Sequence, residues 1–492
     1  MTFTSFQFLA FLPIVVLLYY LCPPRFRWAV LLVASCYFYA AFIPKYILIL
    51  FALIAIDYTM ARLIERAKGR RRVSYLAVSI LSTVSILFVF KYFDFFSYNL
   101  AALAQFLHWN YSLTLLSLAL PLGLSFHTFQ SLSYVIEVYR GTYKAERHIG
   151  IYALYVLFFP QLIAGPIERP QHLLPQLKVT HNFSPERALS GIRLMAWGYF
   201  KKLVIADRLG MSVDYIWANY THVPSLSICI AIVFFAFQLY TDFSGYSDIA
   251  RGAARVLGIN LAINFEQPYF SASITEFWRR WHISLSTWFR DYLFTPVGLK
   301  LGRWGRGGAY SAVLSTFTIM GLWHGAGWTY IVMGFLFGSY IVLDLLTKTY
   351  RTRFMKATGL SHYAVAHKIF KQITTFILVA LTWVFFRSPQ LHTAFLFIGR
   401  LFVDWHLTLS EVIEKFFMFP FNTLGINQSD LFISCTATLV LLTVEHFQRT
   451  HKIGEWYRRR PILVRSFLFS GLLLTIGLFS IISTKQFIYF QF

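Results

Sequence analysis

The sequence predicts an all-α, polytopic membrane protein. Of its 492 residues, 57% are hydrophobic and 13% are charged, whereas soluble proteins average about 45–50% and about 25%. Apolar runs near the ~20 residues that cross a bilayer recur along the whole length. These runs are continuously apolar and lack the alternation of barrel strands, which argues against a β-barrel. We therefore expect one membrane domain over 1–492, with about 11–13 spanning or re-entrant helices.

The distribution of charge supports this fold. The formal net charge is +23, but the basic residues gather in short segments, namely 62–72, 140–147, 348–356 and 458–465. Short basic loops between hydrophobic helices mark the cytoplasmic side of a membrane. Topology therefore explains most of the excess, and we expect contact with membrane lipid and no nucleic-acid partner. The four cysteines all lie in apolar runs and form neither a metal-ligand spacing nor a disulfide framework.

The N-terminal third alternates apolar runs with short polar or basic segments. The basic 62–72 loop fixes its end of the preceding helix in the cytoplasm, so the N-terminus is expected outside. The first run lacks the basic region of a signal peptide and is interpreted as a retained helix. The expected helices run over 6–22, 28–43, 46–60, 74–96 and about 113–136, with an external loop over 97–112.

The middle of the chain, from 150 to 300, consists of short apolar runs interrupted by proline, glycine and charge. Irregular or polar backbone at membrane depth is tolerated only where it is buried in protein or lines a cavity. We therefore expect irregular or re-entrant segments there. Near the other end of the chain, a helix over 466–484 follows a basic segment and leaves the C-terminus outside as well.

His324 stands within a run, Gly307 to Val342, that contains no Asp, Glu, Lys or Arg. Both flanks of the run are basic, so both are expected in the cytoplasm and the run crosses an even number of times. Gly325 and Gly327 offer a turn, because glycine permits a sharp change of direction. A helix over 309–323 would rise ~22 Å, which places His324 deep in the bilayer at the tip of a hairpin. Such a histidine is either functional or a packing residue hydrogen-bonded to a neighbouring helix.

A second histidine, His282, lies in the charged and aromatic stretch Glu276 to Phe294, which we predict to be one helix. At 100° per residue, Arg279, His282, Ser286 and Arg290 share an arc of about 80°. Such a polar stripe indicates either the lining of a wet cavity or an amphipathic helix that lies flat on the membrane surface. The second interpretation leaves His282 unexplained.

The two histidine-bearing stretches resemble a known family. ITEFWRRWHISLSTWFRDYLF followed by GLWHGAGWTYIVMGFLFG is similar to the membrane-bound O-acyltransferase (MBOAT) family, and most similar to its bacterial alginate O-acetyltransferase branch. Supporting stretches are 121–141, 158–170, 242–269 and the terminal FIYFQF, so the resemblance covers the whole chain, with a motif core at about 121–340. There are two departures. The PLGG that this branch commonly shows after the first histidine is missing, and His127 replaces a usual aromatic residue, which we interpret as structural.

The resemblance implies a bundle of helices around a tunnel through the membrane, with His324 at the waist of the tunnel. It also implies an O-acetyltransferase that takes an acetyl group from a cytoplasmic thioester, with acetyl-CoA as co-substrate and no permanently bound cofactor. The acceptor would be an extracytoplasmic partner or a polysaccharide hydroxyl of alginate, another exopolysaccharide or peptidoglycan. The protein would be a multi-pass protein of the bacterial cytoplasmic (inner) membrane.

The chemistry of acyl transfer fits the two histidines. A base must take the proton of the acceptor hydroxyl, and a neutral imidazole suits this role near pH 7. Burial disfavours imidazolium and keeps the base competent. We assign His324 as the general base, and His282 as the residue that orients the acceptor or polarises the thioester carbonyl. Two histidines without a third nitrogen or thiolate ligand argue against a zinc site.

Residues near the two motifs are candidates for substrate or donor binding. They are Asn264, Trp278, Arg279, Ser286, Arg290, Asp291 and Trp323.

Two alternatives remain open from the sequence. One is transfer of D-alanine from a carrier protein to teichoic acid, as in a related branch of the family. The other is a proton-coupled transporter or flippase with His324, His282 and Asp242 as a relay, although the paired halves typical of such transporters are not evident. Outside a relay, Asp242 and Asp248 are expected to cap helices.

Overall fold

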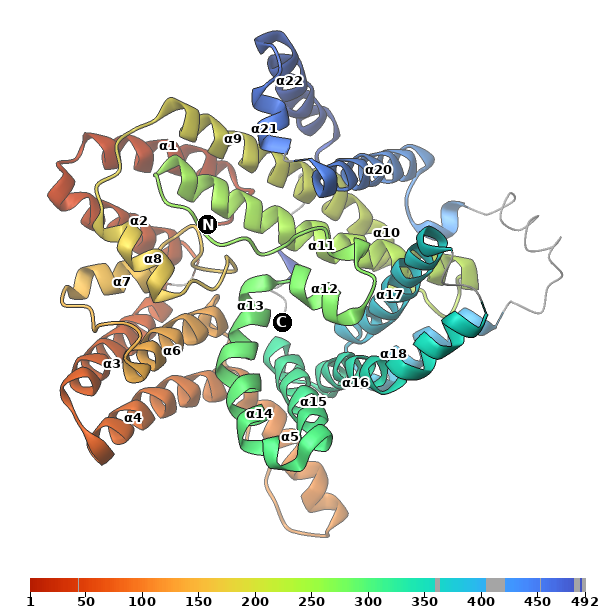
Figure 1. Ribbon diagram of the computed structural model, residues 1–492, viewed down its shortest axis with the longest axis horizontal. Coiled ribbons are helices and arrows are strands. Elements are labelled where there is room, and N and C mark those ends of the chain that lie inside the picture. Colours follow the sequence, from red (N-terminus) through yellow and green to blue (C-terminus); the bar gives the residue numbers. More distant parts are fainter. Residues whose placement is uncertain (43, 359–362, 404–420, 452, 482–486, 489–492) are drawn as a thin grey trace. The chain divides into compact units, whose positions relative to one another are not determined.

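The computed structural model describes residues 1–42, 44–358, 363–403, 421–451, 453–481 and 487–488. Every regular element within these ranges is helical, as Figure 1 shows. The chain forms two compact units, which are described separately. Unit 1 holds 1–195 and 246–263, and unit 2 holds 196–245 and 264–492. The predicted all-α class is confirmed, and one membrane domain over 1–492 stays a prediction.

Seven helical stretches in the described ranges are long and apolar enough to cross a membrane. They are Pro44–Arg66, Gly69–Phe106, Ser225–Val256, Trp328–Ala357, Ala364–Arg387, Gln428–Thr450 and Ile462–Phe479. Two shorter helical stretches, Phe6–Leu21 and Leu391–Phe402, are also apolar. The protein is therefore a multi-pass membrane protein. The count of 11–13 segments, which includes re-entrant ones, stays a prediction.

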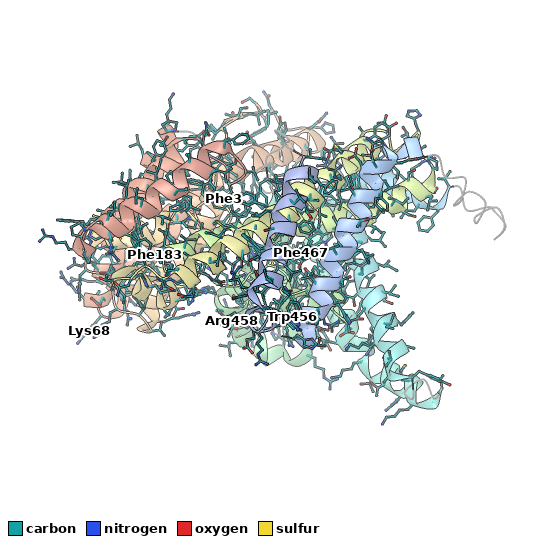
Figure 2. All side chains as sticks on the ribbon, turned by 90° about the horizontal axis from the view of Figure 1, so that it is seen from above. Phe3, Lys68, Phe183, Trp456, Arg458 and Phe467 are labelled. Atoms are coloured by element: carbon teal, nitrogen blue, oxygen red, sulfur yellow. The ribbon has the colours of Figure 1, made fainter. Side chains whose placement is uncertain are left out.

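Unit 1 is built around a hairpin of two long helices, α3 and α4, with α6 packed against both. The helices that lie in or begin in this unit are α1 (Phe6–Leu21), α2 (Arg27–Ala40), α3 (Ile47–Arg66), α4 (Gly69–Leu87), α5 (Phe93–Phe106), α6 (Leu124–Arg140), α7 (Ile149–Leu157), α8 (Pro170–Lys178) and α9 (Pro185–Tyr199). Figure 2 shows Lys68, in the basic loop between α3 and α4, at the margin of this unit, and Phe3 among its helices.

Two expected boundaries in this unit are wrong. α4 continues through a π-helical turn, Phe88–Tyr92, into α5, so the expected loop over 97–112 is helical as far as Phe106. α6 begins at Leu124 instead of about 113, because Pro121 lacks the N–H that a helix interior uses and Gly123 adopts a left-handed φ of 76°. Apolar content alone does not distinguish an extended apolar segment from a helix.

A buried carboxylate ties the helices of unit 1 together. Asp57 of α3 is fully buried and accepts hydrogen bonds from Ser79 at 2.5 Å, from Thr83 and from Ser131. These hydroxyls belong to α4 and α6, so one side chain links three helices. Because a buried carboxylate without partners is costly, this polar contact fixes how the three helices pack.

Unit 2 carries the histidine motifs. The helices that lie wholly or mainly in it are α10 (Asp207–Ala218), α11 (Ser225–Val256), α12 (Ile274–Arg280), α13 (Ile283–Phe289), α14 (Thr295–Leu301), α15 (Gly305–His324), α16 (Trp328–Ala357), α17 (Ala364–Arg387), α18 (Leu391–Gly399), α20 (Gln428–Thr450), α21 (Ile453–Arg458) and α22 (Ile462–Phe479). The expected helix over 466–484 corresponds to α22. Residues 482–484, and residues 489–492 of FIYFQF, lie outside the described ranges.

Candidate active site

His324 lies at the tip of a tight helical hairpin. α15 ends at His324 and α16 begins at Trp328, which confirms the expected turn at Gly325 and Gly327. The two helices touch through glycine: a Cβ atom on Gly321 would lie 2.2 Å from the carbonyl oxygen of Tyr330. The hairpin therefore holds the histidine on closely packed backbone.

The imidazole of His324 is buried within unit 2, with 5% of the residue exposed. Its ring centroid lies 5.0 Å from that of Trp323 and 5.8 Å from that of Phe386 on α17. Both aromatic rings meet the imidazole edge-on. Aromatic packing on these sides restricts the orientation of the ring, as a positioned catalytic group requires.

His282 lies at a break between two helices, so the prediction of one helix over Glu276–Phe294 is wrong. α12 ends at Arg280, α13 begins at Ile283, and His282 adopts a left-handed backbone with φ 43° and ψ 55°. The segment that starts at Asn264 causes the break by pairing with the turn. The N–H of Glu266 donates to the carbonyl of Arg280, and the N–H of Ile283 donates to the carbonyl of Asn264, both at 2.9 Å. A continuous helix would use those same groups internally.

The side chain of Asn264 organises this turn. Asn264 is fully buried, and its Oδ1 accepts hydrogen bonds from the backbone N–H of Ser284 at 3.2 Å and from the Ser284 hydroxyl at 2.9 Å. Nδ1 of His282 lies 3.1 Å from the same oxygen. Since a backbone N–H can only donate, the Asn264 atom is an acceptor and Nδ1 of His282 must carry the proton. In the neutral ring, Nε2 then holds the lone pair.

The two histidines share one neighbour. The Trp323 ring centroid lies 6.4 Å from His282 and 5.0 Å from His324, so the same indole adjoins both imidazoles. His282 is fully buried and meets the ring of Phe243 on α11 edge-on at 4.7 Å. Burial lowers the pKa of the His282 imidazole well below its usual range, and the nearby His324 acts in the same direction. The neutral form is therefore favoured.

The structure separates the other predicted residues into two groups. Trp278 is buried, with its ring 5.0 Å from that of Phe337. Ser286 donates its hydroxyl to the carbonyl of Trp281 at 3.2 Å. Trp278 thus belongs to the packed interior, and Ser286, which is half-buried, holds the turn through its backbone contact. The predicted polar stripe does not form, because the break at His282 interrupts its helix.

The charged candidates lie toward the surface. Arg279 and Arg290 are exposed, and Arg290 forms an ion pair with Asp291 at 2.8 Å. Arg279 lines an open cavity of about 950 Å³ between α12, α17 and α20. Lys368 and Arg449 line the same cavity. Two carboxylates also line it: Glu276, which pairs with Arg280 at 2.9 Å, and Glu266. Within the described ranges, Arg279, Lys368 and Arg449 make no ion pair with a carboxylate, so the lining keeps an excess of positive charge.

A buried charge cluster in unit 2 was not expected. Lys202 lies 2.8 Å from a carboxylate oxygen of Asp207 and 2.5 Å from one of Asp242, and all three are buried. Burial alone would lower the pKa of Lys202, but the two carboxylates outweigh it and raise the pKa.

The expectation that Asp242 and Asp248 cap helices is wrong. Both lie inside α11, where Asp248 pairs with Arg251 at 3.3 Å. The one sequence signal for the cluster was the lysine pair at 201–202 in an otherwise apolar stretch. Within the described part of the chain, no three His, Cys, Asp or Glu side chains are placed to hold a metal ion, and the absence of a metal stays a prediction.

Comparison with known proteins decides the family. The model of the MBOAT, membrane-bound O-acyltransferase family, matches residues 148–387, which include both histidines. The chain is 37% identical to the probable alginate O-acetylase AlgI of Pseudomonas syringae pv. tomato, over 83% of this chain and 77% of that protein. The chain belongs to the membrane-bound O-acyltransferase family. It is therefore an enzyme, and the transporter alternative no longer applies.

Two further relatives of this MBOAT protein differ in how far they match. The peptidoglycan O-acetyltransferase of Helicobacter pylori is 34% identical over 78% of this chain and 76% of that protein. The teichoic acid D-alanyltransferase of Streptococcus thermophilus is 32% identical over only 45% of this chain and 56% of that protein. The extent of the match favours O-acetyl transfer over D-alanyl transfer.

Proposed function

We propose that this MBOAT protein moves an acetyl group from cytoplasmic acetyl-CoA to a polysaccharide hydroxyl on the far side of a bacterial inner membrane. An extracytoplasmic acetyltransferase partner hands the group to the polymer. Support comes from relatives named as alginate O-acetylase and peptidoglycan O-acetyltransferase. The observation that carries the proposal is the pair of buried imidazoles, His282 and His324, beside one indole.

His324 acts as the general base in this proposal. It accepts the proton of the acceptor hydroxyl as the oxygen attacks the thioester carbonyl, and the C–S bond then breaks to release the thiol, which takes up the proton. A positioned base of this kind typically contributes 10²–10⁴-fold in rate. The hairpin of α15 and α16 supplies the rigid support that such positioning requires.

His282 orients the acceptor. Its Nδ1–H is directed to Asn264, so Nε2 of the neutral ring accepts a hydrogen bond from a hydroxyl. A neutral ring in this tautomer has no N–H left to polarise a carbonyl through Nε2. Of the two roles considered for His282, orientation of the acceptor is therefore the better supported.

The open cavity beside α12 takes the phosphates of the donor. Coenzyme A is rich in phosphate, and Arg279, Lys368 and Arg449 bring three positive charges to a space of about 950 Å³. These charges outnumber the carboxylate of Glu266, since the other carboxylate in the lining, Glu276, is paired with Arg280. Arg279 is three residues from His282 along the chain. Binding at this cavity would place the thioester end of the donor toward the histidines.

The test is acetyl transfer by membranes that contain the protein and radiolabelled acetyl-CoA. We expect His324→Ala to lower the rate by about 10²–10⁴-fold. His392→Ala, at an exposed position of α18, is the matched control and should retain the wild-type rate. A His324→Ala protein that accumulates normally and still transfers acetyl groups would remove the catalytic assignment.

The donor assignment has its own measurement. Arg279→Gln and Lys368→Gln should raise the KM for acetyl-CoA several-fold and leave kcat within about twofold. Contacts to the donor phosphates stabilise the bound ground state and the transition state equally, so losing them changes KM and not kcat. Lys300→Gln changes an exposed lysine outside the cavity and serves as control. An unchanged KM would mean that the donor phosphates bind elsewhere.

A further inference from the structure

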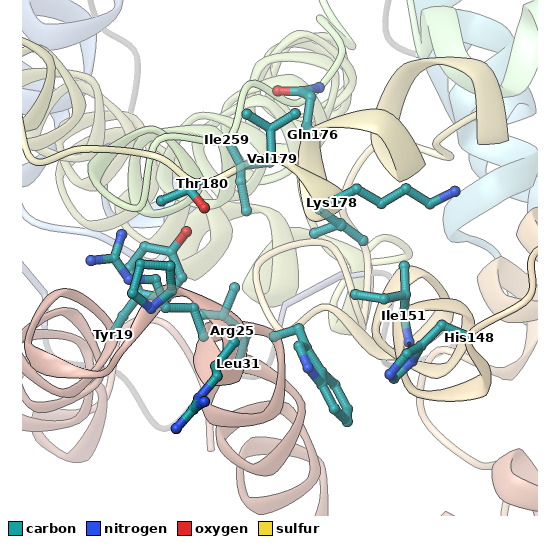
Figure 3. A pocket seen from close by; sticks show the side chains of 14 residues that line it. Tyr19, Arg25, Leu31, His148, Ile151, Gln176, Lys178, Val179, Thr180 and Ile259 are labelled. Atoms are coloured by element: carbon teal, nitrogen blue, oxygen red, sulfur yellow. Dashed lines mark hydrogen bonds between the residues drawn. The ribbon is translucent and has the colours of Figure 1, made fainter.

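A second cavity lies wholly within unit 1, and none of its lining residues takes part in the proposed acyl transfer. It measures about 300 Å³ and is enclosed by the end of α1, the start of α2, and parts of α7 and α8. Figure 3 shows the side chains around it. Arg25, Arg27 and Lys178 line the cavity, and none of its lining residues is Asp or Glu. The charged side chains that line this cavity are therefore all positive.

The three cations differ in how far they are already engaged. Arg27 donates to the carbonyls of Tyr20, Cys22 and His181, which makes it part of the wall. Lys178 pairs with the buried Glu146. Arg25 is exposed and, among the described residues, contacts no carboxylate; its guanidinium lies over the ring of Phe26 at 4.8 Å. Arg25 is therefore the cation most available to a ligand.

Neutral donors complete the lining. Nδ1 of His148 accepts the backbone N–H of Ile151 at 3.2 Å, so in the neutral ring the proton lies on Nε2, which can donate. Thr180 adds a hydroxyl to the same lining. A small cavity with arginine, imidazole N–H and hydroxyl donors and without carboxylates matches a phosphate group, whose oxygens accept several such bonds.

The surroundings of the cavity are apolar and exposed. Leu17 and Leu21 at the end of α1 are 59% and 73% exposed, and Val179 and Phe183 next to α8 are 61% and 54% exposed. In a membrane protein, exposed aliphatic and aromatic side chains of this kind face acyl chains. Anionic headgroups near basic residues at the surface add attraction. The cationic cavity and its apolar rim together have the amphipathic pattern of a phospholipid.

We propose that this cavity binds a phosphate group, with Arg25, His148 and Thr180 as the donors that meet it. The apolar rim makes a phospholipid the favoured source of the phosphate, and a soluble phosphate is the alternative source. Bound lipid would join α1, α2, α7 and α8, since residues of all four helices or their ends line the cavity. The inference does not depend on acetyl transfer.

The experiment measures thermal unfolding of the full chain in detergent with three probes: phosphatidylglycerol, phosphatidylcholine and inorganic phosphate. Wild-type protein should be stabilised by phosphatidylglycerol at lower concentration than by phosphatidylcholine. Arg25→Gln should weaken the apparent affinity for phosphatidylglycerol about tenfold, the loss expected for one charged contact of about 1.4 kcal/mol. Lys68→Gln removes an exposed charge of the same unit that does not line the cavity. It should bind as wild type does.

The responses of the variants to the three probes distinguish a lipid site, a soluble-phosphate site and no site. Protection by inorganic phosphate that Arg25→Gln weakens would keep the phosphate site and assign it to a soluble ligand. Equal responses of Arg25→Gln and Lys68→Gln to all three probes would overturn the proposal. A Thr180→Val variant gives a second test, because it removes a donor without changing the charge, and it should also weaken phosphatidylglycerol binding. Gel filtration of each variant confirms that it is folded.

Discussion

The packing of α15 on α16 allows a sharp test of how His324 is positioned. In Gly321→Ala, the new Cβ would lie 2.2 Å from the carbonyl oxygen of Tyr330 and 3.0 Å from the Cα of Gly334. Ordinary contact begins near 3.4 Å, so the two backbones must separate by about 1.2 Å. A shift of about 1 Å at a catalytic group can cost about 10²-fold in rate. Because His324 is three residues from the substitution, we expect a loss of that size.

The matched control is Gly327→Ala in the turn of the same hairpin. Its Cβ would lie 3.4 Å from the ring of Tyr330, which is an ordinary contact. The assay is acetyl transfer from labelled acetyl-CoA at saturating donor, with protein amounts matched by immunoblot. Gly327→Ala should keep at least half of the wild-type kcat. If Gly321→Ala is folded and as active as Gly327→Ala, then either the hairpin does not position the base or His324 is not the base.

Three further outcomes follow from the site. Asn264→Ala leaves the Nδ1–H of His282 and the N–H of Ser284 buried without an acceptor, at a cost of about 1–3 kcal/mol each. It should therefore lower both the midpoint of thermal unfolding and kcat. The control Ser284→Ala should lower both quantities less. Lys202→Met leaves two buried carboxylates uncompensated and should destabilise the protein by about 3–5 kcal/mol, measured by denaturant titration in detergent. Burial lowers the pKa of His282 in the folded state, so at acidic pH the unfolded chain binds more protons at this residue than the folded chain does. The contribution of His282 to the free energy of unfolding should therefore be fully present above the unfolded-state pKa of about 6.5. It should decline as the pH falls below that value. Thermal unfolding between pH 5 and 8 should show this decline in wild type and less of it in His282→Gln.

The sequence was informative where a local signal controlled the structure. The hairpin at His324 followed from an uncharged run interrupted by Gly325 and Gly327, and the structure has that turn. Composition and basic loops were enough to identify a multi-pass helical protein. In each case the deciding information lies within one short segment or in the average over the chain.

Sequence reasoning failed where distant segments decide the local structure. Nothing between Glu276 and Phe294 is a glycine or proline, so the break at His282 has no local signal. The break arises because the segment after Asn264 takes the backbone groups of the turn. Likewise, the pairing of Lys202 with Asp242 joins residues 40 positions apart. Such contacts are tertiary, and periodicity within one segment cannot reveal them.

The left-handed backbone of His282 has a consequence for how this residue is replaced. At a φ of 43° glycine is at ease, whereas any residue with a Cβ pays roughly 1–2 kcal/mol. An alanine mutant therefore keeps the conformational penalty while losing the ring that compensated for it through Asn264. Glycine at this position removes the ring and the backbone penalty together, so a comparison of His282→Gly with His282→Ala isolates the penalty. The difference in unfolding free energy between these two variants would measure the strain that the native turn stores at His282.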